Sequence, residues 1–168
     1  MALIVETGAG LSNSESYASV DYFLSYHAAR GNVSAAEMTT AEIEASLRKA
    51  TDYMTQKYRN AWAGYRRLIT QALDWPRIDV VTDIYRYVDN TIVPIDVQNA
   101  CCELALRAYT ANLLPDTTQA KISTTVGQIS VTYDKNSRQG THYKAIDYML
   151  QPYLSDCVTG VNTRLVRS

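Results

Sequence analysis

The feature that most constrains this chain is a long helical signal between two prolines, Pro94 and Pro115. A proline can begin an α-helix but cannot continue one, so the helix is expected between them. At about 100° per residue, its polar side chains gather on one narrow arc: Asp96, Asn99, Glu103, Arg107 and Thr110. The remaining surface is apolar and wider than one neighbour can cover. We therefore expect this helix to be covered on two or three sides, by its own chain or by a neighbouring subunit.

Three shorter helices are also expected. Ser19 is a good N-cap for a helix over 20–30, which Gly31 would end. Thr39 and Glu42 fit a capping box, and the apolar stripe behind them predicts a helix through Tyr58. A short final helix is expected over 141–150, closed by a proline.

Residues 121–134, KISTTVGQISVTYD, show the best hairpin pattern, with alternating apolar positions on both sides of a glycine. Residues 78–93 are typical of a poor strand or an irregular hairpin arm. These patterns together predict a mainly α protein, a small helical bundle of about four helices with a β-hairpin. We expect one domain over 1–154 and an extended C-terminal arm over 155–168.

Composition favours a protein that carries no chemistry of its own. The chain has two histidines and three cysteines, and Cys101 and Cys102 are adjacent on a helix, where they cannot bridge or chelate together. Gly8 and Gly10 lie in a loop that lacks the other residues of a phosphate-binding motif. We expect reduced cysteines, no enzyme activity, no metal and no cofactor. No apolar run approaches the roughly 18 residues of a membrane span, so no membrane association is expected.

Basic and aromatic residues alternate along the stretch from Tyr58 to Arg77. Arg59, Arg66 and Arg67 accompany Trp62 there, which is the mixture that a single-strand-binding surface uses for stacking and phosphate contact. The same mixture arises where arginines lie over buried aromatics or pair across a subunit interface. The formal net charge of -1 favours the second interpretation, because dedicated nucleic-acid binders usually carry a basic excess.

Two segments are left over after the helical core is accounted for. The C-terminal arm ends in Arg164, Leu165, Val166 and Arg167, and is either a disordered terminus or an arm that docks on a partner, for example by strand addition. The hairpin turn at Val126, Gly127 and Gln128 cannot be stable alone. It is expected to pack on the helices, to join another strand, or to reach into the lumen of a ring.

Several segments resemble a family of small proteins encoded among the head genes of tailed bacteriophages. The resemblance covers most of the chain and is carried by these stretches: MALIVETGAGLSNSESYAS at the start, ARGN at 29–32, ATDYMTQKYR at 50–59, TQALDWPR at 70–77, IVPIDVQNACCELALRA at 92–108 and VGQISVTY at 126–133. Members are often labelled "putative DnaT-like single-stranded-DNA-binding protein". Relatives also resemble head-completion or adaptor proteins of the virion neck.

The resemblance implies two different functions. An adaptor would be a homo-oligomeric ring, a dodecamer, bound beneath the portal protein and to a downstream neck or tail-completion protein, with packaged double-stranded DNA passing through without sequence readout. It would be made in the host bacterial cytoplasm and end in the virion neck. The alternative is a phage replication accessory protein that binds single-stranded DNA. The nearly neutral charge, the widely apolar central helix and the 13 tyrosines favour the adaptor.

Overall fold

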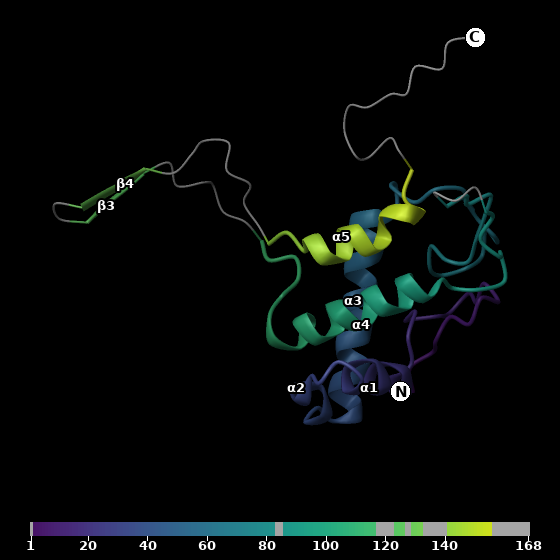
Figure 1. The fold of residues 1–168 in the computed structure, drawn as a ribbon, viewed down its shortest axis with the longest axis horizontal. Helices are drawn as coiled ribbons and strands as arrows, with labels where there is room; N and C mark the ends of the chain where they lie inside the picture. Colours follow the sequence, from purple (N-terminus) through teal and green to yellow (C-terminus); the bar gives the residue numbers. More distant parts are fainter. Residues whose placement is uncertain (1, 83–85, 117–122, 127–128, 133–140, 156–168) are drawn as a thin grey trace, which may run out of the picture.

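The computed structural model describes residues 2–82, 86–116, 123–126, 129–132 and 141–155. It confirms the mainly α class with a β-hairpin (Figure 1). The described elements are α1 (Val20–Ala28), α2 (Val33–Ala36), α3 (Thr40–Tyr58), β1 (Tyr65–Arg66), β2 (Arg77–Ile78), α4 (Ile95–Thr110), β3 (Ser123–Val126), β4 (Ile129–Thr132), α5 (Lys144–Leu150) and the short 3-10 helix η1 (Gln151–Tyr153).

The central helix is α4, and its own chain covers it from several sides. It crosses α3, and α5 lies beside it (Figure 1), while α1 packs near its middle. Seven of its side chains are buried: Val97, Ala100, Cys101, Cys102, Leu104, Ala105 and Ala108. Most of these are small, so the neighbouring helices approach closely and exclude water from the contact. The wide apolar surface predicted for this helix is therefore largely used within one subunit.

The sequence predicted α4 up to Pro115, but the helix ends at Thr110. Ala111 is already extended, with φ -151° and ψ 156°. One residue later, the Asn112 side chain accepts a hydrogen bond from the backbone N–H of Leu114 (3.1 Å). An asparagine that bonds its own backbone in this way favours a turn over a helix, which explains why the helix ends before the proline.

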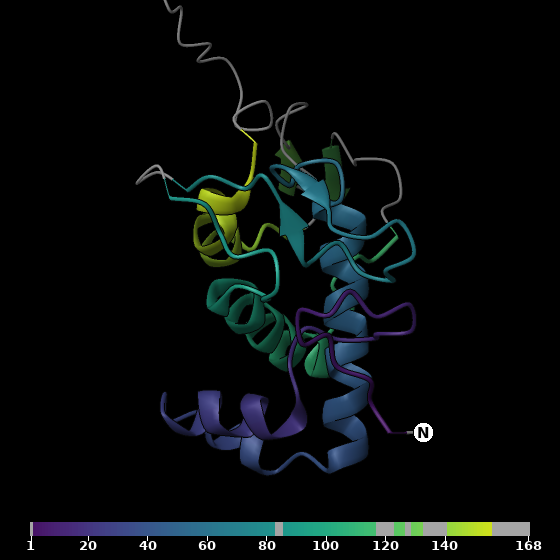
Figure 2. The same ribbon diagram turned by 90° about the vertical axis from the view of Figure 1, so that its right-hand side faces the viewer.

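The helix starts predicted at Ser19 and at Thr39 are confirmed, whereas the final helix α5 begins at Lys144, three residues after its predicted start at 141. The Ser19 side chain accepts from the backbone N–H of Tyr22 (3.1 Å), and Thr39 and Glu42 form the complete capping box. Figure 2 shows α3 along the height of the body, with α1 and α2 at one end and the small β1–β2 ribbon at the other. Helix α2 was not predicted, because four residues are too few to show a helical period.

The region between α3 and α4 is irregular, as its sequence indicated, but it contains pairing that was not foreseen. Strands β1 and β2 are antiparallel, with Tyr65 opposite Ile78. Further on, Val81 and Tyr87 form an isolated antiparallel bridge, and the Val88 N–H donates to the carbonyl of Val80 (2.9 Å). Of the two forms expected for 78–93, the irregular hairpin is therefore the one observed in the described residues.

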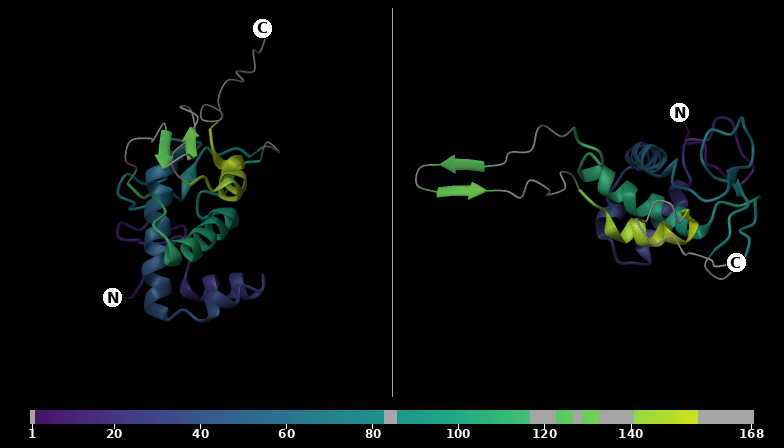
Figure 3. Two further views of the ribbon diagram at one scale, coloured as in Figure 1. Left: turned by 90° about the vertical axis from the view of Figure 1, so that its left-hand side faces the viewer. Right: turned by 90° about the horizontal axis from the view of Figure 1, so that it is seen from above.

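The predicted β3–β4 hairpin is present and antiparallel, with Val126 opposite Ile129. Gly127 and Gln128, named for its turn, lie outside the described residues, as does the C-terminal arm over 156–168. In Figure 3 the two strands lie apart from the helices. Neither strand has a second pairing partner among the described residues.

The glycine- and serine-rich loop near the N-terminus is organised around one buried carboxylate. Glu6 is only 2% exposed. Its oxygens accept hydrogen bonds from the backbone N–H groups of Gly8 and Gly10 (both 2.9 Å) and of Leu11 (2.8 Å), and from the Ser14 hydroxyl (3.1 Å). Four donors satisfy a charge that would otherwise be costly to bury.

Replacing Glu6 with glutamine should therefore destabilise the protein. The amide keeps the shape, but its NH2 group faces backbone N–H donors and cannot accept from them. We expect the Glu6→Gln free energy of unfolding to fall by about 2–3 kcal/mol, measured by urea denaturation. Glu37→Gln is the matched control, since Glu37 is exposed directly after α2, and should change this free energy by less than about 0.5 kcal/mol. Equal losses in both variants would contradict this role of Glu6.

His27 is a core histidine, and its tautomer follows from its two partners. It is fully buried, with Nε2 3.1 Å from the carbonyl oxygen of Cys102 and Nδ1 2.9 Å from the Asn32 side-chain amide nitrogen. A carbonyl can only accept, so Nε2 carries the proton and Nδ1 accepts from Asn32. Burial lowers the pKa of His27 below its ordinary value, since the charged form would be desolvated.

Stability should therefore fall on mild acidification. In the unfolded chain His27 has a pKa near 6.5, above that of the folded state, so the unfolded state binds the proton first. The contribution of neutral His27 is full above pH 6.5 and is lost as the pH falls from 6.5 towards the lowered pKa. Thermal unfolding between about pH 7.5 and 5.5 checks this, and His27→Gln should be less stable but flatter over the same interval. An equally steep decline in His27→Gln would assign the effect to other groups.

Candidate functional site

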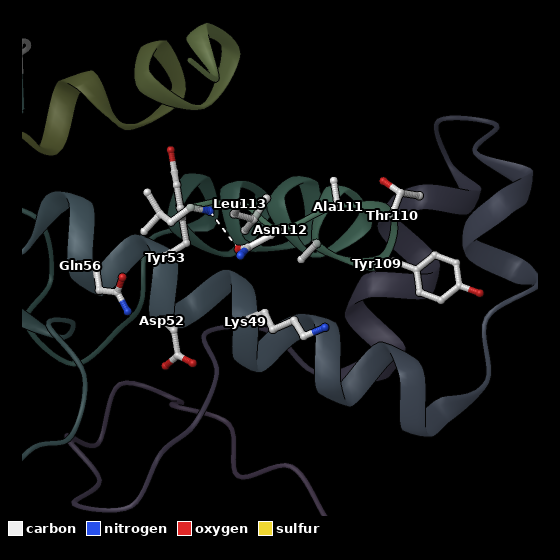
Figure 4. Close-up of a pocket in the computed structure, with 11 residues that line it drawn as sticks. Lys49, Asp52, Tyr53, Gln56, Tyr109, Thr110, Ala111, Asn112 and Leu113 are labelled. Atoms are coloured by element: carbon white, nitrogen blue, oxygen red, sulfur yellow. Dashed lines mark hydrogen bonds between the residues drawn. The ribbon is translucent and has the colours of Figure 1, made fainter. Parts of the chain in front are cut away.

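The structure has an open hollow at the C-terminal end of α4, here called the C-end hollow. It has a volume of about 610 Å³ and lies between α3 and the chain that leaves α4. Lys49, Asp52 and Gln56 lie in a row along one side of α3, at helical spacing (Figure 4). The other wall consists of residues 108–114, which include the Asn112 turn.

Exposed apolar side chains line part of the C-end hollow. Tyr109 is 46% exposed and Leu114 is 48% exposed. Asp52 makes no hydrogen bond or ion pair with any described residue, and partial burial raises the pKa of its carboxyl. The hollow thus combines an unpaired carboxylate with apolar surface.

A second hollow lies at the opposite end of the same helix, here called the N-end hollow. Its volume is about 560 Å³, and it is lined by the first residues of α4 together with the N-terminal segment. Ile92 and Ile95, 45% and 66% exposed, flank Pro94 there. Tyr22 lies on its wall and donates a hydrogen bond to Asn99 Oδ1 of α4 (2.8 Å). Both ends of α4 therefore present apolar side chains to solvent, on different sets of residues.

A smaller hollow, of about 370 Å³, lies between α3 and α5. Asp147 of α5 accepts from Lys57 (2.6 Å) and from the Tyr58 hydroxyl (2.5 Å), and lies 3.1 Å from His142. Although burial opposes it, these partners hold the pKa of Asp147 below its usual range. Burial and the hydrogen bond to Asp147 raise the pKa of Tyr58. This network fastens α5 onto α3 and already satisfies its own charges.

The residues named for nucleic-acid contact are mostly occupied within the fold. Trp62 is 5% exposed and packs edge-on against Trp75, with ring centroids 5.7 Å apart. Arg67 donates to the Gly8 carbonyl (2.9 Å), and Arg66 donates to the carbonyl of Gln71. Arg59 pairs with Asp74 (3.3 Å). The ring of Trp62 thus faces protein, and the arginines connect the loops around it.

Other aromatic residues of this region do face solvent. Tyr65 is 70% exposed, directly before Arg66 and Arg67 in the sequence, and Tyr87 is 75% exposed on the irregular hairpin. Composition alone could not distinguish exposed Tyr65 from buried Trp62, because both belong to the same basic and aromatic stretch. The short β1–β2 pairing decides which ring points outward.

The two hypotheses on leftover segments fall largely outside the described residues. Outside the described residues lie the four residues of the arm, Arg164, Leu165, Val166 and Arg167, and two of the hairpin turn, Gly127 and Gln128. Of the residues named in these hypotheses, Val126 at the end of β3 is described. Within the described ranges, no three His, Cys, Asp or Glu side chains gather as a metal site requires. No helix of the described part has the length and hydropathy needed to cross a bilayer.

The residues at the two ends of α4 were missed as functional candidates. In the sequence, Asp52 is one of several polar residues of the helix that ends at Tyr58, and Ile95 is one of many apolar residues of the central helix, so neither indicates a site. The only sequence signal was that the apolar surface of this helix is wider than one neighbour can cover, which left a contact with a further subunit open. The position of the uncovered part depends on how α3, α5 and the loops pack, which periodicity does not report.

The chain belongs to the family described as "Putative DnaT-like ssDNA binding protein", whose model matches residues 1–168. This agrees with the family label that the sequence motifs suggested. No curated protein and no solved structure matches the chain.

Proposed function

We propose that this protein is a structural component of the bacteriophage neck, a subunit of a ring that joins the head to the tail. The observation that carries the proposal is the pair of different apolar ends on α4, the N-end hollow with Ile92 and Ile95 and the C-end hollow with Tyr109 and Leu114. A closed ring needs two different surfaces on opposite sides of each subunit, because every subunit contacts its neighbours head to tail.

The spacing of these two ends supports a contact between subunits. Helix α4 rises about 1.5 Å per residue, so Asp96 and Thr110 lie about 21 Å apart along its axis. One subunit cannot bring its own two ends together through a helix of this length. The N-end of one copy can meet the C-end of the next, and both sets of exposed apolar side chains would then be removed from water.

The charge distribution also supports a structural role. The chain carries a net charge of -1, and the arginines of the basic and aromatic segment are engaged with backbone carbonyls and with Asp74. Such a subunit works by geometry and performs no catalysis. In this proposal the ring binds the portal protein on one rim and a neck or tail-completion protein on the other, and packaged DNA passes through it.

The leftover segments have places in this proposal. The β3–β4 hairpin has two strand edges without a partner among the described residues, which suits addition to a neighbour or a position towards the channel. The arm ending in Arg164 to Arg167 remains the predicted contact with a partner.

Copy number in purified virus particles tests the proposal. Quantitative mass spectrometry against isotope-labelled peptide standards should find about twelve copies per particle, in constant ratio to the portal protein, as a closed ring requires. The major capsid protein and a phage replication protein serve as positive and negative references. Absence from particles, with abundance in infected cells, would overturn the neck assignment.

A second candidate function is binding of single-stranded DNA, and the description of the family favours it over the neck ring. One observation in the structure suits it: exposed Tyr65 directly precedes Arg66 and Arg67. In this position the aromatic side chain of Tyr65 can stack on a base while the guanidinium groups of Arg66 and Arg67 contact phosphates.

For this second candidate, fluorescence anisotropy with a labelled oligothymidine should show binding that weakens steeply with salt. Tyr65→Ala should reduce the affinity about tenfold, because stacking contributes about 1–3 kcal/mol per base. Since Tyr65 is exposed, the variant should keep its melting temperature, unlike substitutions of Arg66 or Arg67, which also hold loops. Val33→Ala, similarly exposed on α2, is the control. Salt-independent binding, or none, would exclude this function.

A further inference from the structure

The described chain ends close to the N-end of α4. The Tyr153 hydroxyl donates to Asp96 Oδ2 in the first turn of this helix (2.8 Å). Leu154 forms a bridge with Trp62, and the Ser155 N–H donates to the carbonyl of Ala61 (2.8 Å). The remaining residues, 156–168, therefore start from a fixed point beside the N-end of α4, on the opposite end of this helix from the C-end hollow.

The carboxylate of Asp52 in the C-end hollow has no ion-pair partner among the described residues. Asp52 has no described partner, whereas every other described carboxyl with a shifted pKa is shifted downward by its hydrogen bonds and neighbouring charges. Lys49 stands one turn away on the same wall, but forms no ion pair with Asp52. The opposite wall offers the exposed apolar side chains of Tyr109 and Leu114, whereas Leu113 is buried.

The end of the chain has the complementary composition. The sequence of residues 164–167 is Arg-Leu-Val-Arg, so one guanidinium group lies on each side of two apolar side chains. Arginine is well suited to such a contact, because its planar fork binds a carboxylate with two hydrogen bonds and its guanidinium is more weakly hydrated than the ammonium of lysine. Leucine and valine could cover the exposed apolar side chains of the same hollow.

Distance favours the hollow of a neighbouring copy over that of the same chain. The stretch from Asp156 to Arg164 spans about 30 Å when fully extended. The two ends of α4 are about 21 Å apart in a straight line through the body, and a path around the body is longer. An arm folded back on its own subunit would therefore use much of its length, which is about 40 Å from Asp156 to Arg167 when fully extended. In a head-to-tail contact, the N-end of one copy lies against the C-end of the next, and the arm starts beside the hollow that it fills.

We propose that the C-terminal arm of each subunit docks in the C-end hollow of the neighbouring copy, where Arg164 or Arg167 pairs with Asp52 and Leu165 and Val166 cover Tyr109 and Leu114. This inference rests on the proposed ring, and it names the segment and the charge pair that hold one subunit to the next.

A charge-exchange experiment on the full chain tests the docking. Asp52→Arg and the double variant Arg164→Asp/Arg167→Asp each place like charges in the contact, so each should weaken self-association at least about tenfold. Sedimentation velocity at low salt measures the degree of self-association relative to a monomer of 18.8 kDa. Protein concentrations from about 10 to 500 μM suit the weak affinity expected of a head-to-tail contact.

Mixing the two variants in equal amounts separates docking between copies from docking within one chain. In the mixture, the aspartate-bearing arm of the double variant meets the arginine at position 52 of the Asp52→Arg variant, where the charges are again opposite. The unchanged arm of the Asp52→Arg variant meets the unchanged hollow of the double variant. Association should therefore return in the mixture if arms are exchanged, and stay low if each arm binds its own subunit. Glu37→Arg makes the same charge change at an exposed position outside the hollow and should associate like the original protein.

The remaining outcomes are also decisive. Circular dichroism and thermal unfolding should be unchanged in Asp52→Arg, because Asp52 has no described hydrogen bond to lose. An original protein that stays monomeric throughout, association that the variants leave unaltered, or a mixture that stays dissociated would each overturn the arm docking. Association that the variants leave unaltered would still agree with a ring, whereas absence from virus particles would reject the ring itself.

Discussion

The fold depends on the burial of α4 against three other helices of its own chain. Small side chains along this helix, among them Ala100, Cys101 and Ala105, are fully buried. They allow α3 and α4 to cross closely, and larger residues from α3 and α5, such as Leu47 and Ile146, complete the core. The alanines and cysteines bring little apolar area of their own, so stability comes from close packing, in which a small change of volume on α4 would be felt by every neighbour.

The sequence was informative where one local rule decided the structure. The cap at Ser19, the capping box at Thr39 and Glu42 and the pairing of β3 with β4 each involve residues a few positions apart, and all were found as expected. The end of α4 was misplaced because the proline was the stronger signal, whereas Asn112 makes the turn earlier.

Contacts between distant segments could not be read in the same way. Nothing local shows that Trp62 turns inward while Tyr65 turns outward, or that Asp52 lies beside a hollow. These positions result from how loops and helices pack, and the same residue types would look identical in other arrangements. The candidate site therefore comes from the structure, although the excess apolar surface of α4 indicated that some contact was still missing.

The two adjacent cysteines of α4 sample different neighbours, and this makes them internal reporters of how the helices separate. The sulfur of Cys101 lies 3.5 Å from the Thr51 hydroxyl of α3, while the carbonyl of Cys102 bonds to His27 of α1. Both thiols are fully buried, and burial raises the pKa of each. They react with a thiol reagent only after an opening motion exposes them. Modification of Cys101 would record the departure of α3 at Thr51 together with that of the N-terminal segment at Ser16, so the rate of this reaction would time the opening of the core on that side.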